Sequence, residues 1–219
     1  MNSPNQIARA VVLAGGASRR MGEDKAFLRL GEETLASRLV RGLQTFSERV
    51  GISVASADDF AEFLEKDVEL YIDERWRRGP LEGLRSSLRA MPEDYALFVA
   101  VDTPTVWVPL ARHLFQAARS AGRAAIPRFG TRLQVGFAVY GRDLLGEIER
   151  CSEDTSLYQI ADWPGVTVVD LNDPEVVARV GEGKIMPDEL FWSVNTPEER
   201  DRLRQAYSAG EISGDAAVF

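Results

Sequence analysis

The stretch IARAVVLAGGASRRMGEDK, residues 7–25, decides which fold to expect. Its first part, residues 7–13, holds an apolar run at residues 10–13 and is followed closely by the adjacent Gly15 and Gly16, which is typical of a parallel strand buried on both faces. Three cations come next, Arg19, Arg20 and Lys25. We therefore expect a buried strand whose carboxyl end opens into a glycine-rich, cationic loop.

The rest of the chain alternates strand patterns with helical ones. The strongest strand pattern is YALFVAV, residues 95–101, which is uninterruptedly apolar and ends at Asp102. Further strands are expected at residues 50–54, 68–72, 124–127, 132–141 and 166–171, and in the segment that begins at Leu190. Helices are expected around residues 35–46, with Thr34 as a possible N-cap, and around residues 58–65, 81–91, 109–121, 142–150 and 155–162, and from Pro197 onward. This alternation predicts the α/β class, with a mostly parallel, doubly wound sheet in one domain over residues 1–207 and a flexible tail over residues 208–219.

Composition narrows the classes of function. The 219 residues carry a net charge of −8, which argues against a protein that binds a nucleic-acid backbone. No apolar run approaches the roughly 20 residues that span a bilayer, and the first residues lack the pattern of a signal peptide. The single cysteine, Cys151, excludes an internal disulfide and fits a cytoplasmic location. We expect neither a nucleic-acid nor a membrane partner, whereas a small phosphorylated ligand needs only a local positive pocket.

The glycine spacing separates this loop from two common phosphate-binding loops. It matches neither the dinucleotide fingerprint nor the P-loop, which needs Gly-Lys-Ser/Thr after a four-residue gap. A strand-to-helix turn with solvated arginines is the alternative interpretation. The crowding of cations in an acidic protein favours a ligand, and Lys25 is one of only three lysines. An ammonium suits a triphosphate oxygen, and an arginine can grip two oxygens.

Ligands of doubly wound sheets bind beyond the carboxyl ends of the strands, so the residues after each predicted strand are candidates. Asp102 is either a Mg²⁺ ligand that faces the cationic loop or a turn aspartate. Asp73 either accepts hydrogen bonds from a base or ribose or is a solvated loop acid. Gly79 in RRGPLEGL either approaches a ligand closely or belongs to a turn. Asn195 in VNTPEE either contacts ligand or metal or caps the last helix.

Other reactive residues offer little support for a different chemistry. His113 is the only histidine and lies in a predicted helix, and Cys151 has no local partners for nucleophilic catalysis. The aromatic pair Phe191-Trp192 is expected to belong to the core.

Five segments in order resemble the molybdenum cofactor guanylyltransferases, nucleotidyltransferases built on a Rossmann-like sheet. The segments are VVLAGGASRRMGEDKAFLRLG, YIDE, GPLEGL, VAVDTPTV and VNTPEE, which span about residues 7 to 204. The resemblance implies that GTP binds over the loop at residues 13–25 with Mg²⁺ as cofactor. The terminal phosphate of molybdopterin then attacks the α-phosphorus, and pyrophosphate leaves. Molybdenum-cofactor delivery or acceptor proteins are the implied protein partners.

The same resemblance assigns roles to individual residues. Those implied to bind nucleotide are Leu13, Ala14, Gly15, Gly16, Arg19, Lys25, Asp73 and Asp102. The implied catalytic set is Lys25, Asp102 and Arg20, with Asp102 as metal ligand. Gly79 and Asn195 are acceptor-side candidates.

The chain also departs from the family pattern. Ala55 stands where the family commonly has an asparagine after the second strand, and LQVGFAV replaces a segment like His-Pro-Thr. A cytidylyltransferase, or a transferase for another phosphorylated acceptor, is therefore a second interpretation. A nucleotide-binding protein without turnover is a third.

Overall fold

The computed structural model describes residues 6–15, 24–58, 60, 63, 67–74, 79–103, 105–152, 154–181 and 190–208. Three residues of the predicted site, Gly16, Arg19 and Arg20, lie outside the described residues. So do most of the helix predicted at residues 58–65 and the tail beyond Ser208, which is the last residue of helix α6.

Within the described ranges, eight strands form one sheet in the order β10-β7-β9-β6-β1-β4-β5, with β8 paired to β7. Their bounds are β1 Ile7–Leu13, β4 Ser47–Val54, β5 Glu69–Ile72, β6 Tyr95–Ala100, β7 Ala124–Phe129, β8 Arg132–Leu133, β9 Phe137–Gly141 and β10 Val166–Asp170. A separate ribbon joins β2 (Arg29–Leu30) to β3 (Glu33–Thr34).

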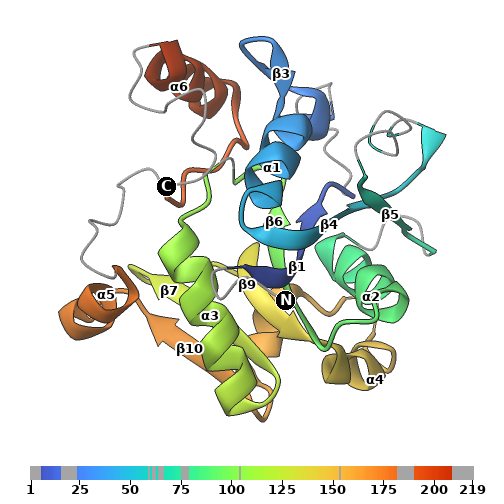
Figure 1. Cartoon of the computed structure of the whole chain (residues 1–219), viewed down its shortest axis with the longest axis vertical. Coiled ribbons are helices and arrows are strands. Elements are labelled where there is room, and N and C mark those ends of the chain that lie inside the picture. Colours follow the sequence, from blue (N-terminus) through green and yellow to red (C-terminus); the bar gives the residue numbers. More distant parts are fainter. Residues whose placement is uncertain are drawn as a thin grey trace.

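Most of the sheet is parallel. The pairs β10–β7, β6–β1, β1–β4 and β4–β5 are parallel, and β9 runs antiparallel to both β6 and β7. Helices cover both faces of the sheet, as Figure 1 shows. The predicted α/β fold with a mostly parallel, doubly wound sheet is confirmed.

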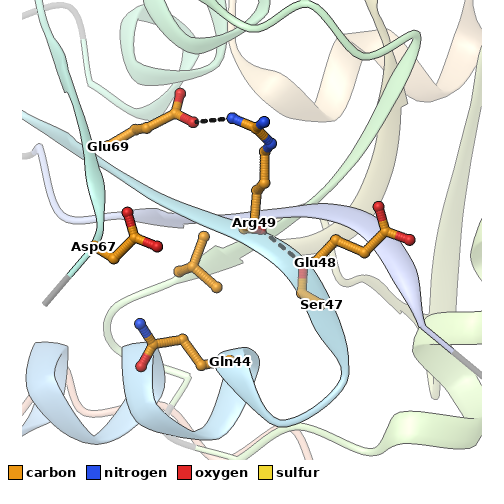
Figure 2. Close-up of a pocket in the computed structure, with 7 residues that line it drawn as sticks. Gln44, Ser47, Glu48, Arg49, Asp67 and Glu69 are labelled. Atoms are coloured by element: carbon orange, nitrogen blue, oxygen red, sulfur yellow. Dashed lines mark hydrogen bonds and ion pairs between the residues drawn. The ribbon is translucent and has the colours of Figure 1, made fainter. Parts of the chain in front are cut away.

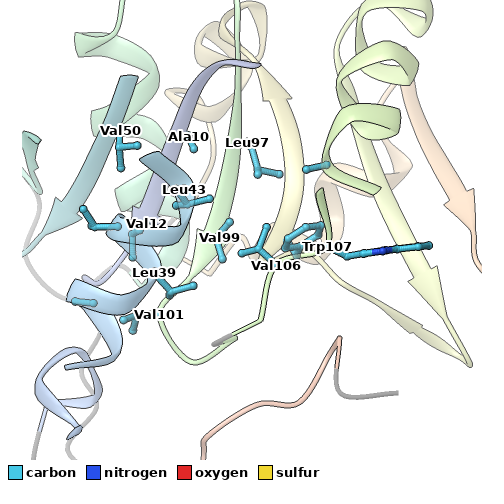
Figure 3. Packing of buried hydrophobic residues seen from close by; sticks show 14 of the residues in the cluster. Ala10, Val12, Leu39, Leu43, Val50, Leu97, Val99, Val101, Val106 and Trp107 are labelled. Carbon is cyan, nitrogen blue, oxygen red and sulfur yellow. The ribbon is translucent and has the colours of Figure 1, made fainter. Parts of the chain in front are cut away.

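Strand β1 explains why the opening stretch predicted this fold. Ala10 and Val12 pack into a core with α1 and α3, whereas Val11 and Leu13 pack into a second core with α2 and α4. Figure 3 shows the first core, where Leu39 of α1 packs over this face of the sheet. Apolar residues fill both faces of this strand, so its pattern is continuous instead of alternating.

The helices begin and end at residues with identifiable roles. Their bounds are α1 Leu35–Gln44, α2 Pro80–Ala90, α3 Val108–Ala121, α4 Leu145–Ile148, α5 Pro174–Gly181 and α6 Pro197–Ser208, with 3₁₀ segments at Lys25–Phe27, Arg142–Leu144 and Leu157–Asp162. Thr34 caps α1, as predicted, by accepting the Ser37 N–H at 3.1 Å. Gly79 precedes α2 with a φ of 66°, a left-handed conformation that favours glycine.

Two expectations differ from the structure, and one helix was not expected. Residues 132–141 form two short strands, because the chain turns between β8 and β9. The segment after Leu190 is no strand: it lies against the end of β6, where the Val194 N–H bonds the Asp102 carbonyl at 3.0 Å and the Leu190 carbonyl accepts from Thr105. Helix α5 was not predicted, although Asp173-Pro174-Glu175 is a typical helix start.

The parallel topology brings the carboxyl ends of four strands to one edge of the sheet. These are β6, β1, β4 and β5, adjacent in that order. None of the helices among the described residues is long and apolar enough to cross a membrane.

Candidate active site at the carboxyl edge of the sheet

The two predicted aspartates stand at separate points of this edge. Asp102 follows β6 and Asp73 follows β5, with β1 and β4 between those strands. At the usual spacing of about 4.8 Å between strands, the two strand ends are about 14 Å apart. This edge therefore carries two separate polar centres.

The first centre joins three segments that are distant in sequence. The Lys25 ammonium lies 3.2 Å from Oδ2 of Asp102 and donates to Oδ1 of Asn195 at 2.6 Å. The Lys25 side chain is 13% exposed and that of Asp102 is 27% exposed. Lys25 opens a 3₁₀ turn that Asp24 caps by accepting the Ala26 N–H at 3.0 Å. The structure thus brings together three predicted site residues at the edge of solvent.

Asn195 is placed by the start of α6. The N-cap is its neighbour Thr196, whose Oγ1 accepts the Glu199 N–H at 3.2 Å, while Glu199 accepts the Thr196 N–H at 3.0 Å. This reciprocal pair is a capping box. Glu199 also accepts the Asn195 N–H at 2.6 Å. Because Thr196 caps the helix, the Asn195 side chain is left to contact Lys25.

The oxygen atoms of this centre fit a magnesium ion that takes most of its ligands from outside the protein. In the described part of the chain, no three acidic, histidine or cysteine side chains gather into an all-protein metal site. Mg²⁺ is usually bound by one or two carboxylates, with phosphate and water oxygens completing its octahedron. Asp102 and the amide oxygen of Asn195 match that requirement.

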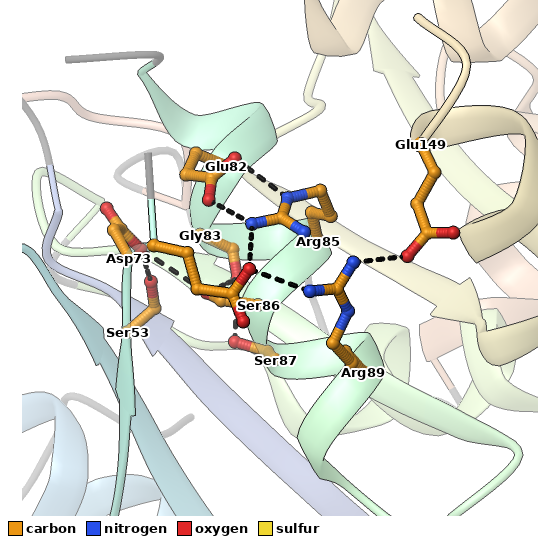
Figure 4. Close-up of polar contacts among 10 residues, drawn as sticks. Ser53, Asp73, Glu82, Gly83, Arg85, Ser86, Ser87, Arg89 and Glu149 are labelled. Carbon is orange, nitrogen blue, oxygen red and sulfur yellow. Dashed lines mark hydrogen bonds and ion pairs between the residues drawn. The ribbon is translucent and has the colours of Figure 1, made fainter. Parts of the chain in front are cut away.

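The second centre is built around Asp73. Its Oδ1 accepts hydrogen bonds from the hydroxyl groups of Ser53 on β4, at 3.1 Å, and Ser86 on α2, at 3.3 Å (Figure 4). Its Oδ2 faces Gly15: a Cβ at that glycine would lie 2.5 Å from the oxygen. The predicted residues Gly15 and Asp73 are therefore neighbours, and a side chain at Gly15 would displace the carboxylate from its present position.

Asp73 is a perturbed carboxylate. Burial raises its pKa to about 6, and the nearby Glu82 carboxylate adds to the rise. The hydrogen bonds from Ser53 and Ser86 and the charge of Arg85 oppose it. Perturbed carboxylates cluster at functional sites, which favours a ligand-binding role over that of a solvated loop acid.

The loop backbone next to Asp73 is partly committed to the sheet. The Leu13 carbonyl accepts the Val101 N–H at 3.1 Å, and the Ala14 N–H bonds the Ser53 carbonyl at 2.9 Å. Within the described ranges, the Ala14 carbonyl and the Gly15 N–H make no backbone hydrogen bond. Ala14 and Gly15 can therefore offer these two backbone groups to a ligand.

A cavity of about 650 Å³ adjoins the first centre. It extends from Asp102 and Asn195 to an aromatic wall, and its volume is typical of a ligand pocket. The wall consists of Phe129, Phe137, Tyr158, Phe191 and Trp192. Gly79 precedes another lining residue, Pro80.

The site role of several residues at this edge was not predicted from the sequence. Phe191 and Trp192 do pack against the core, as expected, but they also line the cavity. Arg132 and Tyr158 line it too and carry no local motif. Ser53 had a signal: it is a polar residue within the apolar strand pattern GISV, and a buried polar side chain calls for an explanation.

Comparisons with known proteins identify the family. The profile of the MobA-like NTP transferase domain matches residues 10–168. A protein of Opitutus terrae named "Probable molybdenum cofactor guanylyltransferase" is 34% identical over 215 residues, covering 94% of this chain and 100% of that protein. A "Molybdenum cofactor guanylyltransferase" of Syntrophotalea carbinolica is 35% identical over 145 residues, covering 66% of this chain and 68% of that protein.

A solved structure agrees at the level of the fold. The molybdopterin-guanine dinucleotide biosynthesis protein A of Archaeoglobus fulgidus superposes with a TM-score of 0.75 at 20% identity, covering 92% of this chain and 99% of that one. The matched profile includes the two strand-end aspartates and Lys25. The chain belongs to the MobA-like NTP transferase family and is a nucleotidyltransferase of the molybdenum cofactor guanylyltransferase type.

Proposed function

We propose that this protein transfers GMP from GTP to the terminal phosphate of molybdopterin in a Mg²⁺-dependent reaction that releases pyrophosphate. The observation that carries the proposal is the cluster of Lys25, Asp102 and Asn195 beside a cavity of about 650 Å³. Family membership supports the transfer chemistry, and the names of the relatives suggest guanine and the molybdenum cofactor.

The reaction needs positioning and charge compensation more than proton transfer. An oxygen of the acceptor phosphate forms a bond to the α-phosphorus of GTP, and the bond from that phosphorus to the bridging oxygen of the pyrophosphate breaks. Because the attacking group is already an anion, no side chain has to remove a proton from it. Lys25 is suited to hold phosphate oxygens, since Asp102 and Asn195 fix its ammonium at the strand end.

Asp102 and Asn195 would hold the metal from the protein side. Mg²⁺ held there would supply neutralisation of the charge that develops on the leaving pyrophosphate. Asp102 offers a carboxylate for that purpose, and Asn195 offers an amide oxygen already directed at the same ammonium.

The aromatic cavity supports an acceptor site for a flat, phosphorylated molecule. Phe129 and Tyr158 are 41% and 57% exposed, so their rings are available to a ligand. Rings of this kind pack against flat ring systems, and the exposed cation Arg132 lies in the same lining. Asp73 and Gly15, at the other end of the edge, would contact the nucleoside. Gly79 stays an acceptor-side candidate through its neighbour Pro80.

The test is pyrophosphate release from molybdopterin with each of the four nucleoside triphosphates, with and without Mg²⁺. We expect release with GTP and Mg²⁺ only. Preference for CTP would instead support cytidylyl transfer, an alternative left open by the exposed Ala55, whose side chain has no polar atom for a guanine. Nucleotide-dependent thermal stabilisation without any release would identify a nucleotide-binding protein that lacks turnover.

Two further expectations belong to this proposal. The single cysteine supports a cytoplasmic setting. Proteins that deliver the molybdenum cofactor, or accept it, would be the partners.

A further inference from the structure

We infer that Ser53 and Ser86 are positioning residues for Asp73: their hydroxyl groups hold one carboxylate oxygen, so that the other is directed at the loop where the nucleoside of GTP would bind. The inference rests on the proposed function, because it concerns the same nucleotide site. It adds two residues to which neither the sequence motifs nor the comparisons assign a role.

Three elements of the fold converge on this carboxylate. Ser53 belongs to β4, Asp73 follows β5, and Ser86 lies on the inner face of α2. Both hydroxyls bond the same oxygen, Oδ1, at 3.1 and 3.3 Å, and the serines are 0% and 7% exposed. Figure 4 shows both serines beside the Asp73 carboxylate. Two donors from different elements fix the plane of the carboxylate, which a single bond would leave free to rotate.

The glycines around this centre leave room for the arrangement. A Cβ at Gly83 of α2 would lie 2.5 Å from Oγ of Ser53, and a Cβ at Gly15 would lie 2.5 Å from Oδ2 of Asp73. The Ser53 carbonyl also accepts the N–H of Ala14 at 2.9 Å. Ser53 thus connects the orientation of Asp73 with the backbone of the loop after β1.

The charged groups around Asp73 explain why its ionisation depends on the two hydroxyl groups. Glu82 and Arg85 lie on α2, paired at 2.5 Å and nearly buried, and Glu74 follows Asp73 and bonds Arg85 at 3.0 Å. No described cation donates a hydrogen bond to Asp73 itself. Hydroxyl donors favour the ionised carboxylate, and burial and Glu82 disfavour it. Without the hydroxyls, the pKa of Asp73 would rise above its value of about 6, and a protonated carboxyl would meet the nucleoside near neutral pH.

Ser87 provides a matched control. It follows Ser86 on the same helix and is 0% exposed, but its hydroxyl donates to the Gly83 carbonyl at 2.7 Å and bonds no part of Asp73. Ser86 is also within 3.2 Å of that carbonyl, so its single proton is shared between two acceptors. We therefore expect a larger effect at Ser53 than at Ser86.

The experiment measures the Kd of GTP with Mg²⁺ by calorimetry from pH 6 to pH 8.5. The variants are Ser53→Ala, Ser86→Ala, their combination, Asp73→Asn and the control Ser87→Ala. At pH 6.5–7 we expect the double variant to bind GTP about tenfold more weakly than the wild type, as befits lost hydrogen bonds to a charged group. The Kd of GTP for Ser87→Ala should stay within about twofold of the wild-type value, because this hydroxyl bonds the Gly83 carbonyl and not Asp73. The titration of GTP itself is common to all variants and cancels in the ratios.

The pH profile separates positioning from general damage. Removing the hydroxyls should shift the acid limb of binding to higher pH, so that the double variant recovers much of its affinity at pH 8.5, whereas Asp73→Asn does not. Wild-type affinity of the double variant at neutral pH overturns the inference, and so does a loss that is equal at all pH values or is shared by Ser87→Ala. If the wild type binds no GTP, the proposed function fails with it. If the wild type binds and Asp73→Asn binds equally well, only the inference fails.

Discussion

The two edges of the sheet each hold a charged cluster, and the clusters differ in how their charges are matched. At the amino edge, Arg9 is 0% exposed and bonds Glu93 at 2.5 and 3.0 Å and Glu69 at 3.0 Å, and it also donates to Tyr71. At the carboxyl edge, the described residues give Lys25 one carboxylate partner, and the side-chain donors they give Asp73 are the hydroxyl groups of Ser53 and Ser86.

This difference shows in the pKa values of the buried groups. Burial by itself would lower the pKa of Arg9, but the hydrogen bonds to Glu93 and Glu69 outweigh it and hold the pKa above its usual value. Burial raises the pKa of Asp73 to about 6, and its partners do not reverse the shift. A buried charge that is paired with opposite charges, such as Arg9, stabilises the fold. We call Asp73 undermatched, because its hydrogen-bond donors are uncharged; such a buried carboxylate costs stability at a place where a ligand is to be bound.

The amino edge also has a hollow, of about 440 Å³. Figure 2 shows Arg49 turned toward Glu69 there, with an ion-pair distance of 3.4 Å. The charges around this hollow extend the Arg9 cluster. A cavity with charged walls is therefore not sufficient to identify a ligand site. The direction of the strands, and whether each buried charge has an opposite partner, indicate which edge of the sheet holds the site.

The largest expected effect is at the carboxyl edge. Asp102→Ala should lower the rate of pyrophosphate release by about 10³-fold, because the metal ligand and a partner of Lys25 are lost together. Circular dichroism and the melting temperature should stay close to the wild type, since Asp102 is partly exposed. Near-normal turnover in this variant would contradict the role of Asp102.

The matching test at the amino edge is Arg9→Met. It should lower the free energy of unfolding by about 3 kcal/mol, the low end for a broken buried pair, because Glu69 keeps 42% of its side chain exposed. Activity per folded molecule should not change. Arg49→Ala, at a side chain that is 62% exposed, is the control and should cost less than about 1 kcal/mol in urea unfolding. A loss of turnover in folded Arg9→Met would contradict the claim that the amino edge serves stability and the carboxyl edge serves activity.

The cost of the undermatched carboxylate can be measured with Asp73→Asn. A folded-state pKa raised from 3.8 to about 6 favours folding at low pH, and this contribution is lost as the pH rises through 6. The variant should therefore exceed the wild type in stability by about 1–2 kcal/mol at pH 7.5, after allowance for partial exposure. The advantage should shrink toward pH 4. A wild type that is the more stable protein at pH 7.5 would reverse the comparison.

The smallest effects separate two neighbouring residues. Asn195→Ala should lower kcat about tenfold through the lost contact to Lys25, with little change in the melting temperature. Thr196→Ala removes the helix cap and should cost about 1 kcal/mol of stability, with kcat within about twofold. The same response from both variants would mean that Asn195 acts only through the start of α6.

Local pattern alone determined a large part of this protein. The apolar run at residues 7–13 predicted a strand with the observed bounds, and Thr34 was identified as the cap of α1. Parallel strands end at a common edge, so the residues after them were candidates from the sequence alone, and Lys25 and Asp102 do meet there. These features follow from burial and chain direction, which leave a periodic trace in the sequence.

Tertiary structure alone decided which side chains become partners. The pairing of Asp73 with Ser53 and Ser86, the contact of Asn195 with Lys25 and the packing of residues 190–194 against β6 all join distant segments. The antiparallel insertion of β9 between β6 and β7 is of the same kind. Periodicity reports that a residue is buried but not which neighbour buries it, because that depends on how the strands are ordered in the sheet.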